Sequence, residues 1–286
     1  MEKNWAIVTG ADGGMGQIIT HALVQAGYPV IMAFKDPEKN ARKVKEKIES
    51  EHKGAIIEIE GINLLSMQSV RDFAQRFIQK KRILSLLLNN AGVLSTEFGT
   101  SENGFERTVS VNYVGPYLLT RLLLPVMQAG SRIINTGSCT YAIGKIENEF
   151  FEKGKRGSFL RIPIYGNTKL ALLLFTRELA SRVKLQGITV NAADPGIVNT
   201  PMITMKKWFD PLTDILFRPF IKTARQGAAT AIHLALSNDL NLVSGCCYAN
   251  CKCKNLPERI ARHPQQKKLW EETEKRIKPF LEPVLP

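Results

Sequence analysis

The chain has 286 residues, of which 44% are hydrophobic and 23% charged, and its formal net charge is +13. These proportions are those of a folded globular protein, and they exclude a chain that is disordered over most of its length. No apolar run approaches the roughly 20 residues of a membrane-spanning helix, and the first apolar run is too short for a secretory signal. We therefore expect a cytoplasmic protein without a transmembrane segment.

Short apolar runs alternate with helical patterns along most of the chain. Strands are predicted at residues 5–8, 29–34, 55–59, 83–88, 132–136, 188–192 and 245–249, and helices at about 15–26, 37–52, 67–77, 103–128, 164–185 and 224–236. Nearly continuous apolar strands between helices indicate a parallel sheet that is covered on both faces. The prediction is one doubly wound α/β domain with a mostly parallel sheet of seven strands. Its ligand crevice is expected at the carboxyl ends of the strands.

A glycine-rich turn at 9–16 joins the first predicted strand to the first predicted helix. Its glycines, Gly10, Gly14 and Gly16, are spaced as G-x-x-x-G-x-G. Such a turn lets phosphate groups approach the backbone at the positive end of a helix dipole. A dinucleotide site is therefore one interpretation, and a turn without a ligand is the other.

Three segments interrupt the alternation of strands and helices. Residues 139–162 and 197–222 follow strand ends, so they can wall the crevice and shape a substrate pocket. The third segment, 252–286, is predicted to be a basic helical extension of a domain that covers 1–251. No linker rich in glycine, proline or serine divides the chain.

The five cysteines are Cys139, Cys246, Cys247, Cys251 and Cys253. An odd number without a secretory signal favours reduced thiols. Zinc binding by the last four is an alternative to simple strand packing. However, Cys246 and Cys247 are adjacent and would face opposite sides of a strand, and no histidine lies nearby at ligand spacing. No metal site is therefore predicted.

The basic residues gather at 35–53, 152–161 and 252–278, without the interleaved aromatic residues that stack on bases. A solvated surface is the favoured interpretation, and no nucleic-acid partner is expected. Peripheral contact with an anionic membrane surface stays open as an alternative.

Tyr165 and Lys169 lie four residues apart in a predicted helix and therefore share one face. A free tyrosine has a pKa of about 10, too high for efficient proton transfer near neutral pH, and a neighbouring ammonium lowers that value. The pair indicates a proton donor for a carbonyl that is reduced, or a base for an alcohol that is oxidised. Because the spacing is common, a core tyrosine beside a solvated lysine is the alternative.

Six motifs follow one another along the chain. They are TGADGGMG at 9–16, NNAG at 89–92, VNYVGPYLLT around Asn112, NTGS ending at Ser138, YGNTK at 165–169 and DPGIVNT at 194–200. Through them the sequence resembles the short-chain dehydrogenase/reductase family over nearly its whole length. The long gap between Ser138 and Tyr165, the ending SGCCYANCKCK and the KLWE at 268–271 are similar to the retinol-dehydrogenase-like branch. The resemblance implies a Rossmann-type fold, and family members are commonly homo-oligomers.

The resemblance also implies a catalytic tetrad. Tyr165 would be the general acid/base, and Lys169 would lower its pKa and hold the ribose hydroxyls of a nicotinamide cofactor. Ser138 would hydrogen-bond the substrate oxygen. Asn112 would kink its helix and hold a water that relays protons. In isolation, Ser138 could be only a strand-end cap and Asn112 only a polar helix residue.

The cofactor-binding residues that the resemblance implies come from every motif. They are Gly10, Asp12, Gly14, Met15, Gly16, Lys35, Asn63, Leu64, Asn90, Ala91, Gly92, Tyr165, Lys169, Pro195, Gly196, Val198 and Thr200. The family usually has aspartate-leucine where this chain has Asn63-Leu64, and the asparagine carbonyl can still accept a hydrogen bond from adenine.

Lys35 carries the choice of cofactor. Enzymes that use NAD present an acidic side chain at the end of the second strand, where this chain has Phe34-Lys35. A cation there favours NADP(H), because it can pair with the 2′-phosphate. NAD(H) is the alternative if Lys35 is an ordinary surface lysine and Asp36 turns inward.

The expected function is that of an NADP(H)-dependent oxidoreductase, a carbonyl reductase or alcohol dehydrogenase, which interconverts a carbonyl and an alcohol on a small molecule. That the molecule is lipophilic is suggested by Trp208, Phe209, Leu212, Ile215, Leu216 and Phe217, although these residues could also pack internally or form an interface. The alternative is a catalytically silent nucleotide-binding protein with a sensing or scaffolding role.

Overall fold

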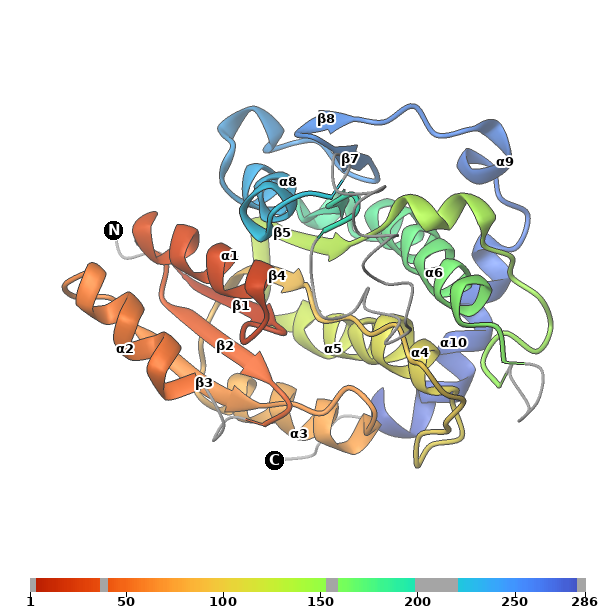
Figure 1. Ribbon diagram of the computed structural model, residues 1–286, viewed down its shortest axis with the longest axis horizontal. Coiled ribbons are helices and arrows are strands. Elements are labelled where there is room, and N and C mark those ends of the chain that lie inside the picture. Colours follow the sequence, from red (N-terminus) through yellow and green to blue (C-terminus); the bar gives the residue numbers. More distant parts are fainter. Residues whose placement is uncertain (1–3, 37–40, 153–158, 199–220, 282–286) are drawn as a thin grey trace, which may run out of the picture.

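The computed structural model describes residues 4–36, 41–152, 159–198 and 221–281. They form one sheet with helices on both faces (Figure 1). The strands are β1 Trp5–Thr9, β2 Val30–Phe34, β3 Ile57–Gly61, β4 Leu84–Asn89, β5 Met127–Thr136, β6 Thr189–Asp194, β7 Cys247–Ala249 and β8 Lys252–Cys253. The helices are α1 Gly14–Gln25, α2 Ala41–Glu51, α3 Met67–Gln79, α4 Arg107–Val109, α5 Gly115–Leu123, α6 Arg161–Arg182, α8 Ala224–Leu236, α9 Glu258–Ala261 and α10 Gln266–Leu281.

The strand order is β3-β2-β1-β4-β5-β6-β7-β8, and all neighbours are parallel except β7 and β8. β1 lies between β2 and β4, with Ala6 opposite Val30 on one side and Leu86 on the other. The direction of winding reverses between β1 and β4. In a doubly wound sheet this switch point is where a ligand crevice opens, and the loops that follow β1 and β4 border it here.

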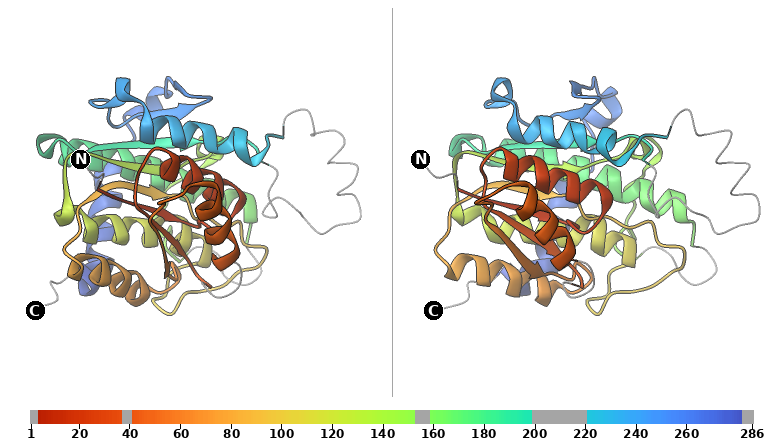
Figure 2. Two further views of the ribbon diagram at one scale, coloured as in Figure 1. Left: turned by 90° about the vertical axis from the view of Figure 1, so that its left-hand side faces the viewer. Right: turned by 60° about the vertical axis from the view of Figure 1, so that its left-hand side comes forward.

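Alternate residues of the central strand face two separate cores. Ala6 and Val8 pack in a core that includes Ile19 of α1 and Ala228 of α8. Ile7 packs on the opposite face, in a core built from α3, α5, α6 and α10. The views in Figure 2 show the two helical layers with the sheet between them. The predicted doubly wound α/β architecture is therefore confirmed.

The sheet has one more strand than the seven predicted. Lys252 and Cys253 pair antiparallel with Ala249 and Tyr248. Asn250 and Cys251 join the two strands with positive φ angles of 51° and 59°. This is the conformation that a two-residue hairpin turn requires. The hairpin went unpredicted because a cysteine in this conformation gives no turn signal in the sequence.

The single helix predicted at about 103–128 is wrong in extent. Helical structure begins with α4, passes through a π-helical turn at Ser110–Val114, and continues as α5 and a 3-10 turn at Leu124–Val126. Strand β5 then starts at Met127, earlier than predicted. Pro125 explains the early end, because it has no N–H for the helical ladder.

The C-terminal helix α10 packs against the domain that precedes it. Trp270 is buried beside Tyr117 and Phe175, with ring centroids 5.0 and 6.0 Å away. Thr273 Oγ1 lies 2.8 Å from the hydroxyl of Tyr113. Glu274 forms an ion pair with Arg121 at 2.7 Å. The helix therefore completes the core on the α5 and α6 side of the sheet.

Among the residues described, every helix is too short or too polar to cross a membrane.

Candidate active site

The glycine turn after β1 is packed too tightly for side chains at two positions. Gly10 has a φ of +62°, and a Cβ there would lie 2.9 Å from the Cα of Ala91. A Cβ on Gly16 would lie only 2.2 Å from the carbonyl oxygen of Gly10. The turn thus rests directly on the loop after β4, and the start of α1 is left open to a ligand.

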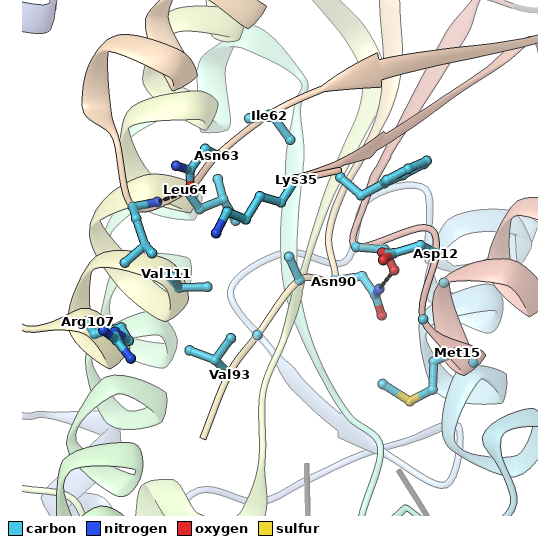
Figure 3. A pocket seen from close by; sticks show the side chains of 18 residues that line it. Asp12, Met15, Lys35, Ile62, Asn63, Leu64, Asn90, Val93, Arg107 and Val111 are labelled. Carbon is cyan, nitrogen blue, oxygen red and sulfur yellow. Dashed lines mark hydrogen bonds between the residues drawn. The ribbon is translucent and has the colours of Figure 1, made fainter. Parts of the chain in front are cut away.

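A cavity of about 460 Å³ lies at this switch point (Figure 3). Its wall includes eleven of the residues predicted to bind the cofactor: Gly10, Asp12, Gly14, Met15, Gly16, Lys35, Asn63, Leu64, Asn90, Ala91 and Gly92. The glycine turn forms one end of the wall, and the loops after β2, β3 and β4 form most of the rest. The cavity therefore joins residues from four loops that are far apart in the sequence.

The polar groups of this wall fit a dinucleotide. The side-chain nitrogen Nδ2 of Asn90 donates to the carbonyl oxygens of Thr9 and Gly10 at 2.9 and 3.3 Å. Its Oδ1 is buried and has no hydrogen-bond partner in the described part of the chain. A buried acceptor of this kind is costly unless a ligand donates to it, and a ribose hydroxyl can do so.

Two cationic side chains line the cavity, and Asp36 does not. Lys35 lies at the end that also holds Asn63 and Leu64. Arg107, from the first turn of α4, reaches the wall beside Val93 and Val111. Sequence reasoning missed Arg107, whose only signal was its place five residues before Asn112.

The side-chain oxygen of Asn63 already has one hydrogen-bond partner within the protein. Its Oδ1 already accepts a hydrogen bond from the backbone N–H of Leu65 at 3.1 Å. A carbonyl oxygen has two lone pairs, so one is left for a ligand.

Lys169 is buried beneath the cofactor cavity. Its ammonium donates to the carbonyl of Thr136 at 2.7 Å. A Cβ on Gly92, in the cavity wall, would lie 3.7 Å from Lys169 Nζ and 3.5 Å from Asn112 Oδ1. Gly92 therefore separates the cavity from both tetrad residues by a single backbone layer.

Asn112 sits in the middle of the π-helical turn Ser110–Val114, which breaks the regular helix as expected. Its side-chain amide donates to the carbonyl of Val93 at 2.8 Å, and its Oδ1 accepts from the N–H of Val93 at 2.7 Å. It also donates to Thr168 Oγ1 at 3.2 Å. The asparagine thereby ties the loop after β4 to α6, directly beside Lys169.

Ser138 and Tyr165 are hydrogen-bonded through their side chains. Ser138 caps the 3-10 turn Cys139–Ile143, and its Oγ accepts from the hydroxyl of Thr140 at 3.0 Å. Tyr165 lies in the second turn of α6, and its ring centroid is 5.4 Å from Lys169 Nζ. The structure therefore brings together the four residues predicted as a tetrad. None of the four lines the cavity, but Gly92, which adjoins Asn112 and Lys169, does.

The pKa values of Tyr165 and Lys169 differ from the prediction that the ammonium lowers the pKa of the phenol. Burial, opposed in part by the hydrogen bond with Ser138 and reinforced by the Asp194 carboxylate, raises the pKa of Tyr165 to about 12. Burial also lowers the pKa of Lys169 to about 8, against the Asp194 carboxylate, which raises it. The net pKa shift of Tyr165 is therefore upward, opposite to the predicted lowering, because desolvation is its largest cause.

Asp194 is a second residue that sequence reasoning missed. It ends β6 and is buried, and its carboxylate forms an ion pair with Lys254 at 3.3 Å. Its other oxygen accepts from the N–H of Gly196 at 2.9 Å. It lay inside the motif at 194–200, but nothing in the sequence linked it to Lys254.

Of the remaining predicted residues, Pro195, Gly196 and Val198 are described by the structure, and none of these three lines the cavity. A Cβ on Gly227 would meet both Val198 Cγ2 at 2.5 Å and Met15 Sδ at 2.9 Å, so Val198 packs close to the turn. Pro195 and Gly196 lie between Asp194 and Val198 and do not line the cavity. Thr200 and the apolar residues predicted at 208–217 lie outside the described residues.

Of the segment 139–162, which was predicted to shape a substrate pocket, the structure describes residues 139–152 and 159–162. Phe150 and Phe151 are buried in the core against Tyr113, with ring centroids 5.5 and 6.4 Å away. These two side chains therefore pack internally.

The burial of Lys169 predicts a pH dependence of stability. The unfolded chain keeps the proton up to a pKa near 10.5, whereas the folded chain releases it near 8. Between these values the unfolded state binds more protons, so the free energy of unfolding should rise with pH, by up to about 3 kcal/mol from this group. Denaturant titrations from pH 7 to 10.5 should show this rise in the nucleotide-free protein relative to Lys169→Met. Exposed Lys184→Met is the control, and a Lys169→Met profile parallel to wild type would contradict the expectation.

Comparison with known proteins identifies relatives over nearly the whole chain. A family model described as short chain dehydrogenase matches residues 4–208. The chain is 35% identical to retinol dehydrogenase 12 of Mus musculus over 266 residues, which cover 92% of this chain and 83% of that protein. It is 34% identical to retinol dehydrogenase 14 of Mus musculus over 289 residues, covering 96% and 86%.

Solved structures share the fold. An uncharacterized protein from Mycobacterium paratuberculosis superimposes with a TM-score of 0.76 at 24% identity, covering 96% of this chain and 94% of that one. A blue fluorescent protein from a metagenomic library, solved in complex with NADPH, superimposes with a TM-score of 0.69 at 25% identity, covering 87% and 96%.

Proposed function

We propose that this chain is an NADP(H)-dependent oxidoreductase that interconverts a carbonyl and an alcohol on a lipophilic small molecule. The chain belongs to the short-chain dehydrogenase family, and retinol dehydrogenases are among its relatives. The observation that carries the proposal is the junction at Gly92. One side of this glycine lines the cavity, and on the other a Cβ would lie 3.7 Å from Lys169 Nζ. A nucleotide held in the cavity would thus end beside the tetrad.

The bound nucleotide would supply the hydride chemistry, which interconverts a carbonyl carbon and an alcohol carbon. Tyr165 would give a proton to the substrate oxygen during reduction and take it back during oxidation. Ser138, already hydrogen-bonded to Tyr165, would donate to the same substrate oxygen and stabilise the charge that develops on it. The phenol is protonated at neutral pH, so it is ready to act as the acid.

Lys169 and Asn112 would support this proton transfer. Lys169 is buried with a pKa of about 8, and a bound ribose and a nearby phenolate would both favour its charged form. Asn112 holds Val93 and Thr168 by hydrogen bonds and so keeps the loop after β4 against α6. We propose that this pairing positions Lys169 under the cofactor.

The preference for NADP(H) over NAD(H) rests on Lys35. It lines the cavity directly after β2, and the carboxylate of Asp36 does not. A 2′-phosphate placed there would gain a charge-assisted contact, whereas a 2′-hydroxyl would gain little.

Lys35→Ala is expected to weaken NADPH binding by about 10- to 100-fold and NADH binding much less, because one charge-assisted hydrogen bond is lost only from the phosphate. Fluorescence titration of the nucleotide-binding affinity measures both values. Lys45→Ala, which removes a surface lysine paired with Glu49 on α2, should leave both affinities unchanged. An equal loss of both nucleotides in Lys35→Ala would mean that Lys35 does not contact the 2′-phosphate.

The substrate class is drawn from the relatives, which are named for retinol. We propose a panel that begins with retinal and retinol and continues with unbranched aldehydes, ketones and alcohols of increasing chain length. Turnover is followed by the absorbance of the reduced nicotinamide. A rise of kcat/KM with chain length supports a lipophilic substrate, and a preference for short polar carbonyls would contradict it.

The silent nucleotide-binding protein is the competing candidate. It predicts NADPH binding without turnover on any member of the panel, although Asn112, Ser138, Tyr165 and Lys169 are all present. Binding and turnover measured on the same preparation separate the two candidates.

A further inference from the structure

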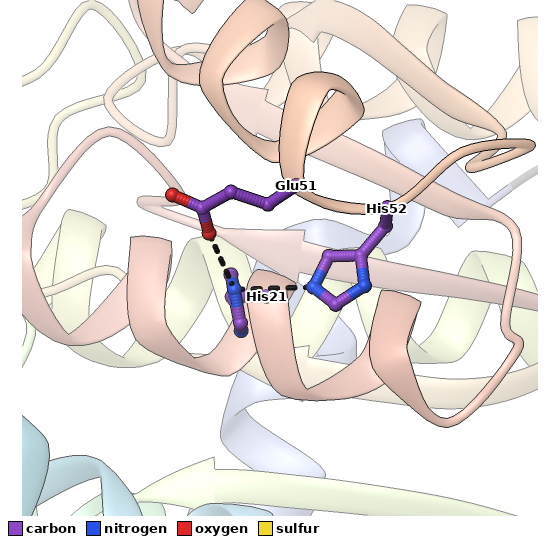
Figure 4. A group of neighbouring side chains, drawn as sticks. All are labelled: His21, Glu51 and His52. Carbon is purple, nitrogen blue, oxygen red and sulfur yellow. Dashed lines mark hydrogen bonds and ion pairs between the residues drawn. The ribbon is translucent and has the colours of Figure 1, made fainter.

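Two histidines and a glutamate from separate parts of the chain meet on the α1 side of the sheet (Figure 4). His21 projects from α1, Glu51 ends α2, and His52 follows it directly. Their ligand atoms, two imidazole nitrogens and one carboxylate oxygen, all lie within 4.8 Å of one another. The cluster is two helical turns along α1 from the glycine turn, and the proposed oxidoreductase activity does not use it.

The hydrogen bonds of this cluster compete for one proton. His21 Nε2 is 2.8 Å from Glu51 Oε2 and 3.1 Å from His52 Nε2. A carboxylate only accepts, so His21 Nε2 must carry its hydrogen toward Glu51. That nitrogen then has no lone pair to accept from His52, and its single hydrogen points elsewhere. The single hydrogen on His21 Nε2 can therefore form a well-aligned hydrogen bond at only one of the two short contacts.

A metal ion at the centre of the three atoms would be coordinated by all of them. Tetrahedral zinc with bonds of 2.0–2.1 Å separates its ligand atoms by about 3.3 Å. The two short separations here, 2.8 and 3.1 Å, lie within about 0.5 Å of that spacing. The third, between Glu51 and His52, is at most 4.8 Å, so the ion would draw these two side chains together. The rings of His21 and His52 meet edge to face at 70°, with centroids 4.6 Å apart, so both Nε2 atoms converge on the same region.

The cluster is reachable from solvent. The side chains of His21 and Glu51 are 39% and 43% exposed. Both line a groove of about 810 Å³ between α1, α2 and α8. A hydrated ion can therefore enter, and a water can fill the fourth position of a three-ligand site.

We propose that His21, Glu51 and His52 form a binding site for a divalent transition-metal ion, with Zn²⁺ as the metal that two imidazoles and one carboxylate suit. The ion joins α1 to the end of α2. Because α1 begins in the glycine turn and α2 is the helix that follows β2 and Lys35 in the chain, the ion links two helices that each follow residues of the cofactor-cavity wall.

The test is a calorimetric titration of the untagged full-length protein with ZnCl₂, together with thermal unfolding in the presence of the metal. One Zn²⁺ per chain is expected, with a rise in Tm of about 5 °C when free metal exceeds Kd 100-fold. His21→Gln and His52→Gln should each lose this binding. His233→Gln is the matched control, because His233 lines the same groove but is not in the cluster.

The cysteines near the C-terminus are the competing ligands. Cys246 and Cys253 lie close enough for their side chains to hydrogen-bond. Zinc binding that survives in His21→Gln, or that is lost instead in Cys253→Ser, would overturn the proposal.

A second measurement avoids the risk that a variant misfolds. In the wild-type protein, hydrogen exchange of amides 44–52 should slow several-fold on addition of Zn²⁺, because the ion ties the end of α2 to α1. Exchange in α10, on the far side of the sheet, should be unchanged. Calorimetric binding without added protection at 44–52 would also overturn the proposal.

Discussion

Tyr165→Phe is expected to lower kcat by about 10²- to 10⁴-fold, which is the contribution typical of a positioned general acid/base. Phenylalanine keeps the ring that packs in the first half of α6 and removes only the hydroxyl that hydrogen-bonds Ser138. Affinity for NADPH should change little, because Tyr165 is not in the wall of the cofactor cavity. Steady-state turnover and fluorescence titration of NADPH measure the two effects.

The matched control for this change is Tyr248→Phe. Tyr248 is a buried tyrosine in β7, outside the tetrad. Its variant should keep wild-type kcat. Turnover in Tyr165→Phe within a few-fold of wild type would reject Tyr165 as the proton donor, whatever its effect on stability.

Gly16→Ala is expected to weaken NADPH binding by about 10²-fold or more. The new Cβ would lie 2.2 Å from the carbonyl oxygen of Gly10 and 2.7 Å from the Cα of Ala11, so the backbone that is proposed to face the phosphates must move. Two or more charge-assisted hydrogen bonds to phosphate then lose their geometry, each worth about 1.5–3 kcal/mol. Overpacking should also destabilise the fold by about 1–3 kcal/mol.

Gly13→Ala, in the same loop, separates the steric effect from the loss of a glycine. A Cβ at Gly13 would meet only the Gly10 carbonyl oxygen, at 3.4 Å, which is an ordinary contact. This variant should bind NADPH within a few-fold of wild type. Equal loss of affinity in both variants would mean that backbone flexibility, and not the close packing at Gly16, governs binding.

The sheet was predictable because most of its strands contain short apolar runs between helical patterns. In β2 every residue is buried, and a run such as Val30–Phe34 has no other stable place than the centre of a covered parallel sheet. The hairpin at Asn250 and Cys251 was not predictable, because its turn depends on two positive φ angles that cysteine rarely adopts. The helix around Asn112 was predicted too long, since the apolar residues continue through the 3-10 turn at Leu124–Val126 into the start of β5.

The sequence by itself determined the architecture and most of the cofactor cavity, because glycine spacing, apolar runs and ordered motifs are local properties of the chain. Only the tertiary structure decided the electrostatics of the site. Asp194 and Lys254 meet although they lie 60 residues apart in the chain, and burial raises the pKa of Tyr165 but lowers that of Lys169. The cluster of His21, Glu51 and His52 likewise exists only because α1 and α2 lie side by side on one face of the sheet. Desolvation and convergence of distant side chains depend on packing, and no local pattern encodes them.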